Sequence, residues 1–115
     1  MAVIAIQTPS ESGTTVTYAA CTGGGDTAAN NGKMLLHVKN GSGAPITVTV
    51  TKSSSASVID PQYGLLTKAD SIVSVGAGAE KFIGPFATGA FNSTSGTIAI
   101  TYSGVTTLTI AAIQI

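Results

Sequence analysis

Hydroxyl-bearing and aliphatic residues alternate along several stretches of the chain. The alternation is strict over residues 46–51, and it returns over residues 97–102 and 107–110. Successive side chains of a β-strand point to opposite faces of the sheet, whereas helical faces repeat every three to four residues. The pattern therefore predicts strands that have one buried aliphatic face and one solvated hydroxyl face.

Nine segments read as strands, because they are rich in Val, Ile, Thr and Tyr and are separated by Gly, Pro, Asn and Ser. They are residues 3–8, 15–20, 34–39, 46–51, 64–67, 71–75, 81–83, 97–102 and 107–115. We expect about eight strands, with one of the weaker middle pair failing to form. No stretch has helical spacing of apolar residues, so helix has little support.

These strands predict an all-β fold with one domain spanning residues 1–115. A chain of this length usually closes a single hydrophobic core. Short strands at this spacing predict an antiparallel β-sandwich, and a jelly roll is the compatible arrangement. In the strand at 34–39, the alternation directs Met34, Leu36 and Val38 to the core. It directs His37 to solvent or to a subunit contact.

Two long connections are expected to be loops, where binding residues often lie. Residues 22–32 contain three consecutive glycines, and residues 53–63 contain a serine run followed by Asp60-Pro61-Gln62-Tyr63. Asp26, Asp60 and Asp70 lie in or beside expected turns, where Asp bonds to nearby backbone groups.

Charge and composition argue against several classes of protein. Five lysines balance five acidic residues and there is no arginine, whereas nucleic-acid binders carry a basic surplus. No run approaches the ~20 apolar residues of a membrane helix, and we read residues 1–8 as a strand rather than a leader. We therefore expect a soluble protein that is made in the cytoplasm and binds neither nucleic acid nor membranes.

Residues that could support catalysis are scarce. The chain has one histidine, His37, and one cysteine, Cys21, which we expect to be a buried free thiol. A zinc site needs several such ligands, and residues 26–32 lack the later acidic ligands of a calcium loop. A nucleophile needs an oriented base beside it, and only His37 could serve. The sequence thus predicts no enzyme, no metal and no cofactor.

The positive feature is an exterior that is rich in hydroxyls and poor in charge. Soluble monomers usually carry more surface charge, so such an exterior indicates cover by partners. Residues 2–6 and 110–115 are apolar at nearly every position. We expect these segments to be central strands or to lie in subunit contacts.

Three stretches resemble the decoration, or cement, proteins of tailed bacteriophages: 32–50; 75–78 with 83–86; and 102–113. The resemblance covers most of the chain from Gly32 onward. It implies a jelly-roll or related sandwich on the outer surface of an icosahedral head, where the protein would stabilise contacts between capsomers without catalysis. It also implies binding to the major capsid protein and a homo-oligomer, with a trimer favoured over a dimer.

Candidate contacts with the capsid or within the oligomer come from residues 1–31 and from apolar residues later in the chain. The N-terminal segment and the Gly-rich connection are expected to engage the capsid, while the later residues serve core or oligomer packing. The candidates are Val3, Ile4, Ile6, Asp26, Asn30, Phe86, Phe91 and Ile113. The rival interpretation is a glycan-binding sandwich of a phage tail or fibre, although the chain has no Trp and only scattered Tyr side chains for ring stacking.

Overall fold

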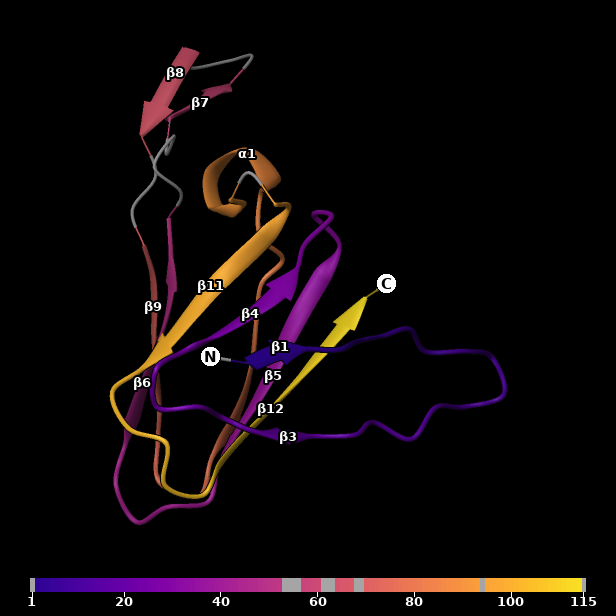
Figure 1. The fold of residues 1–115 in the computed structure, drawn as a ribbon, viewed down its shortest axis with the longest axis vertical. Coiled ribbons are helices and arrows are strands. Elements are labelled where there is room, and N and C mark those ends of the chain that lie inside the picture. Colours follow the sequence, from indigo (N-terminus) through magenta and orange to yellow (C-terminus); the bar gives the residue numbers. More distant parts are fainter. Residues whose placement is uncertain (1, 53–56, 61–63, 68–69, 94, 115) are drawn as a thin grey trace.

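The computed structural model describes residues 2–52, 57–60, 64–67, 70–93 and 95–114 and confirms the all-β prediction (Figure 1). Two five-stranded sheets form the body. Sheet A runs in the order β1 (Ala2–Ile4), β4 (Asp26–Ala29), β11 (Thr97–Tyr102), β6 (Ile46–Thr51) and β9 (Ser71–Val75). Sheet B runs in the order β10 (Glu80–Ile83), β5 (Met34–Asn40), β12 (Leu108–Gln114) and β2 (Ile6–Gln7), with β3 (Ala19–Ala20) also paired to β12.

Two smaller elements lie outside the sheets. β7 (Ser57–Asp60) and β8 (Gly64–Thr67) pair only with each other, and their hairpin extends beyond the body of the molecule (Figure 1). α1 (Thr88–Phe91) is a single helical turn. This turn, the one helix among the described residues, is too short to span a lipid bilayer.

The inner faces of the two sheets form one hydrophobic core. The alternation predicted for β5 is confirmed, because Met34, Leu36 and Val38 are completely buried. From sheet A, Val48 and Val50 of β6 and the isoleucines of β11 pack into the same core. Side chains of this size each contribute about 1.5–3 kcal/mol when they leave water.

The N-terminal segment joins the two sheets. β1 pairs in parallel with β4 of sheet A, and β2 pairs in parallel with β12 of sheet B. The single strand predicted over residues 3–8 is therefore two short strands separated at Ala5. These two pairings make both sheets mixed rather than purely antiparallel, and the jelly-roll arrangement stays a prediction.

Several predicted boundaries are wrong. Residues 22–32 are not one loop, because β4 lies within them, and β7 lies within the second predicted loop, of which residues 53–56 and 61–63 are outside the described part. Only Ala19–Ala20 of the segment predicted at 15–20 is strand. All the weaker middle segments form strands, so the expectation that one fails is also wrong.

The apolar C-terminal segment is a central strand, as one of the two expectations required. β12 lies between β5 on one side and β2 and β3 on the other. Ile110, Ala111 and Ala112 are completely buried, so both faces of this strand are covered. β1, in contrast, is an edge strand.

Candidate functional site

The outer face of sheet A is a continuous surface without charged residues. Burial alternates along its strands, so the residues between the core positions share this outer face. We call this surface the threonine face. It consists of Val3, Thr27, Ala29, Thr47, Thr49, Thr51, Ile72, Ser74, Thr97, Ala99 and Thr101.

The strand register arranges these residues in rows across the sheet. One row runs from Val3 through Thr27 and Ala99 to Thr51. The next row runs from Thr101 through Thr49 to Ile72. Neighbouring strands lie about 4.8 Å apart and the rows about 6.8 Å apart, so the threonine hydroxyl and methyl groups form a regular array.

Two large apolar side chains at opposite edges of the threonine face are strongly exposed. Val3 is 78% exposed on β1, and Ile72 is 68% exposed on β9. Isolated exposed aliphatic residues are ordinary, but here they border a surface that has no charge to keep molecules apart. Chemically, this surface can bind a partner by apolar contact and neutral hydrogen bonds.

The candidate contact residues divide by burial. In the N-terminal segment, Val3 is exposed and Ile6 is half-buried, but Ile4 is 4% exposed and belongs to the core. Phe86 and Phe91 pack edge to face in the core with ring centroids 5.4 Å apart. Of the two roles expected for these phenylalanines, core packing or oligomer packing, the structure therefore shows core packing.

Asp26 is a correction, because it is completely buried on β4 rather than placed in a turn. Its Oδ1 accepts the amide of Ala2 at 3.1 Å. Its Oδ2 accepts the amide of Thr22 at 3.1 Å and the hydroxyl of Tyr102 at 2.8 Å. Burial alone would raise the pKa of the Asp26 carboxyl, but these hydrogen bonds outweigh it and lower the pKa below its usual value.

The Asp26 carboxylate therefore joins the N-terminal strand, the loop before β4 and β11, and it is not available for an external contact. Cys21 lies in the same cluster and is buried, as expected. Burial is the main cause that raises the pKa of its thiol to about 11, with the charge of Asp26 adding to it. Burial and the bond to Asp26 also raise the pKa of Tyr102.

Asn30 is a second correction, because its side chain is 6% exposed and serves the interior of the chain. Its Nδ2 donates to the carbonyl of Phe86 at 3.1 Å and to Oδ1 of Asn92 at 2.7 Å. Asn92 in turn donates to the carbonyl of Asn30 at 2.8 Å. The pair ties β4 to the segment around the helical turn.

The position of His37 also differs from the expectation. It lies on the outer face of sheet B, but it is only 7% exposed because Tyr18 and Phe82 cover it. The Tyr18 hydroxyl lies 2.5 Å from Nδ1, and the Phe82 ring stacks on the imidazole with centroids 4.2 Å apart. Nε2 lies 3.4 Å from Oε1 of Glu80 and has no hydrogen-bond partner among the described residues.

An aromatic ring covers the imidazole of His37. The ring of Phe82, itself 63% exposed, lies over the imidazole and separates it from solvent. His37 lines neither of the two hollows described for the chain. Within the described residues, no group of three His, Cys, Asp or Glu side chains could hold a metal ion.

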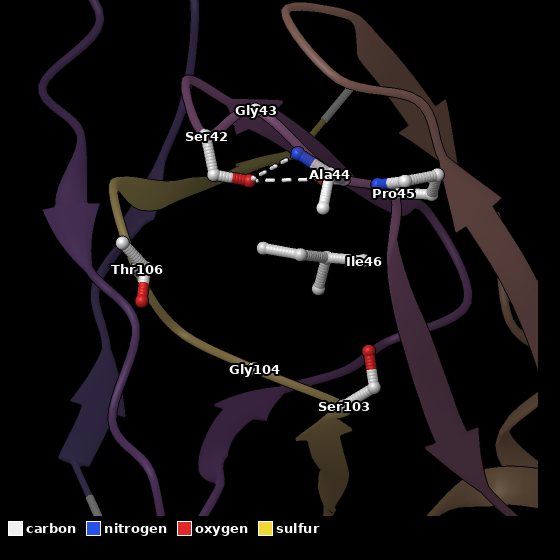
Figure 2. Close-up of a pocket in the computed structure, with 8 residues that line it drawn as sticks. All are labelled: Ser42, Gly43, Ala44, Pro45, Ile46, Ser103, Gly104 and Thr106. Carbon is white, nitrogen blue, oxygen red and sulfur yellow. Dashed lines mark hydrogen bonds between the residues drawn. The ribbon is translucent and has the colours of Figure 1, made fainter.

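The larger hollow, of about 500 Å³, lies between the β5–β6 and β11–β12 loops (Figure 2). Ile46 projects into its centre, and the hydroxyls of Ser42, Ser103 and Thr106 surround it (Figure 2). Two of these hydroxyls already have partners: Ser42 donates to the carbonyl of Ala44 at 2.9 Å, and Ser103 accepts the amide of Thr47 at 2.8 Å. The remaining lining residues are Gly43, Ala44, Pro45 and Gly104, so the hollow has neither a charge nor an aromatic ring.

The sequence pattern found the threonines but not the surface they form. The strict alternation over residues 46–51 and 97–102 indicated one wet hydroxyl face on each strand. Nothing in the sequence showed that β6 and β11 are neighbours, or that β4 extends the same face. A scan against protein-family models, a search of curated proteins and a search of solved structures each return no match for this chain.

Proposed function

We propose that the chain is a structural virion protein that binds the outside of an icosahedral phage head and stabilises the contacts between capsomers. The observation that carries the proposal is the threonine face, a five-stranded surface without charge that ends in two exposed aliphatic side chains. A free soluble protein gains from surface charge, so a large neutral face is typical of a surface that a partner covers.

The rigidity of the sheet supports this role. The threonine face is fixed by four strand pairings, and its inner side packs against the shared core. A rigid surface loses little conformational entropy on binding, which favours docking to an equally rigid protein shell. The major capsid protein is therefore the proposed partner, and the proposed location is the outer surface of the virion.

The N-terminal segment is proposed to contribute through Val3. Its side chain occupies the end of one row of the threonine face, whereas Ile4 next to it is part of the core. Deleting the segment would remove a core residue and a sheet strand, and loss of binding would then be ambiguous. A point substitution at Val3 tests the contact and leaves β1 in place.

The decisive experiment is co-sedimentation of the purified protein with undecorated heads of the phage that encodes it. Thr101→Lys places a charge in the middle of the threonine face, and Thr15→Lys places the same charge on an exposed residue of the loop before β3. We expect Thr101→Lys and Val3→Lys to weaken binding at least tenfold, because a lysine would have to lose its water in the contact. Thr15→Lys should bind like the wild type.

Two results would contradict the proposal. The wild type could fail to sediment with heads at micromolar concentration, or the three lysine variants could bind equally well. Equal binding by all three variants would mean that the capsid contact lies elsewhere than on the outer face of sheet A.

The glycan-binding alternative has one observation in its favour. The ring of Phe82 is exposed, as a sugar-stacking residue must be. Glu80 and Lys39 are register partners on the neighbouring strands β10 and β5, close to Phe82, and their side chains could form hydrogen bonds to sugar hydroxyls. A glycan array would support this alternative if the wild type bound a defined glycan and Phe82→Ala did not.

A further inference from the structure

The free edges of the two sheets differ in length and in charge. Across the described residues, sheet A ends at β1 and β9, while sheet B ends at β10 and at the short strands β2 and β3. Exposed charges protect β10, because Glu80 and Lys81 both lie on it. β1 has three residues and β2 and β3 have two each, whereas β9 has five residues and no charge.

Uncharged edge strands are unusual in soluble proteins. An unpaired edge presents a row of amide and carbonyl groups that can pair with another strand, and proteins normally block it with charge, proline or a short strand. β9 reads Ser-Ile-Val-Ser-Val and has none of these protections. It also exposes Ile72 beside the edge.

One hydrogen bond shows which backbone amides and carbonyls of β9 point away from the sheet. The amide of Ser103 donates to the carbonyl of Thr47 at 2.9 Å, so the backbone of Thr47 faces β11. Backbone groups alternate between the two edges of an antiparallel strand, so residues 46, 48 and 50 face β9 instead. Their register partners on β9 are Val75, Val73 and Ser71.

The amides and carbonyls of Ile72 and Ser74 therefore point away from β6, toward the free edge. Together they present two donors and two acceptors in the order that an antiparallel partner strand requires. Val73 lies between them with its side chain on the inner face, half-buried against the core.

We propose that β9 pairs with β9 of a second copy of this chain, antiparallel about a two-fold axis at Val73. Ile72 then pairs with Ser74 of the second copy through two hydrogen bonds, and the axis generates the same two bonds again. This register is the one that pairs all five residues of the strand. It also keeps the burial pattern in phase, because the inner residues 71, 73 and 75 meet the inner residues of the second copy.

The pairing joins two copies of sheet A into one ten-stranded sheet. A two-fold axis perpendicular to the sheet places both threonine faces on the same side. The dimer would thus present a charge-free surface of twice the area, and two linked contacts bind with avidity on the order of 10²- to 10⁴-fold above one contact. The product is a dimer rather than the trimer that the resemblance favoured.

Cysteine cross-linking tests the register. Residue 73 meets its own copy across a non-hydrogen-bonded pair, where Cα atoms are about 4.5 Å apart and a disulfide fits. Residue 72 faces residue 74 instead, so the two copies of residue 72 lie about 8 Å apart, too far for a disulfide. Under mild oxidation we expect Val73→Cys to give mostly covalent dimer and Ile72→Cys at most a tenth as much.

The Ile72→Cys variant is a stringent control, because position 72 is more exposed than position 73 and would react faster in random collisions. Cys21 is buried and does not interfere. Faster cross-linking of Ile72→Cys, or no cross-linking of either variant, would overturn the proposal.

Sedimentation equilibrium of the unmodified chain gives the independent test. Ser74→Pro removes one outward amide from each copy, and an edge strand tolerates proline at such a position. We expect Ser74→Pro to weaken the dimer about tenfold or more, and Ser74→Ala, which keeps the amide, to change it less than threefold. A wild type that stays monomeric to about 0.5 mM, or that forms trimers, would refute the pairing. The measurement uses the isolated chain, so its outcome is separate from that of head binding.

Discussion

The substitution Tyr102→Phe isolates one hydrogen bond to the buried carboxylate of Asp26. The Tyr102 hydroxyl donates to Oδ2 at 2.8 Å, and the half-buried ring packs against the core. Phenylalanine keeps the ring and removes only the donor. The Asp26 charge then retains the amides of Ala2 and Thr22 as its partners.

The expected loss of stability is about 2 kcal/mol at pH 7. A hydrogen bond to a charged group contributes about 1.5–3 kcal/mol, and a buried carboxylate that loses a donor cannot recover it from water. For a domain of this size, the loss corresponds to a fall in Tm of roughly 8 °C. Tyr18→Phe removes a hydroxyl that contacts Nδ1 of His37 rather than a carboxylate, so it should cost about 1 kcal/mol at the same pH.

Acid pH gives the variant a specific signature. The pKa of Asp26 is lowered by folding, so its charge stabilises the native state above the unfolded pKa of about 4 and this contribution is lost as the pH falls through the folded pKa. The stability deficit of Tyr102→Phe should therefore shrink as the pH falls below about 4. Urea unfolding of both proteins at several pH values measures it.

Two outcomes would refute this reasoning. One is a deficit at pH 7 below about 0.5 kcal/mol, which would mean that the bond contributes nothing beyond a surface contact. The other is a deficit that stays constant into acid, which would mean that the charge of Asp26 plays no part. A double-mutant cycle with Asp26→Asn should give a coupling of about 1–2 kcal/mol.

Three other substitutions or treatments test separate features of the fold. Cys21, with its pKa raised to about 11 by burial, should resist thiol reagents at pH 8 in the native protein and react at once in denaturant; rapid native labelling would contradict its burial. Asn40→Ala should lower the free energy of unfolding in urea by about 3 kcal/mol, because the buried Asn40 side-chain amide donates to the carbonyls of Val75, Gly76 and Ala44. A change near zero would show that water replaces the lost amide. Gly25→Ala should lower the free energy of unfolding by at least about 2 kcal/mol. Gly25 has a φ of 95°, and an added Cβ would lie 2.8 Å from the Ile100 carbonyl oxygen. Unchanged thermal stability of the variant would contradict this prediction.

The strands with the strictest alternation were predicted almost to the residue. Over residues 46–51 and 97–102 the predicted and observed bounds agree, and β5 extends its prediction by only one residue. In these strands the type of side chain predicts its burial, because the large aliphatic residues enter the core and the threonines lie on the outer face. Local sequence is therefore sufficient to predict a strand wherever one face is buried and the other is exposed to solvent.

The prediction failed where distant residues decide the conformation. Asp26 and the three preceding glycines predict a loop where the structure has β4. Tertiary contacts bury the Asp26 carboxylate and supply its hydrogen-bond donors from Ala2, Thr22 and Tyr102. Likewise, His37 is on the outer face as its position in the alternation requires. Its burial by Tyr18 and Phe82 depends on segments 19 and 45 residues away along the chain.

The all-β fold and the hydroxyl-bearing outer faces can be predicted from the amino-acid sequence, because the two-residue period is a property of each strand alone. The pairing of β4, β11 and β6, which joins their threonines into one neutral surface, is visible only in the folded molecule. The same holds for the place of β9 at the end of the sheet, where the backbone groups of Ile72 and Ser74 have no partner strand among the described residues. Strand pairing joins backbone groups that are identical in every residue, so it leaves little trace in the sequence. Side-chain alternation fixes which way each strand faces, whereas the packing of the whole core selects its neighbours.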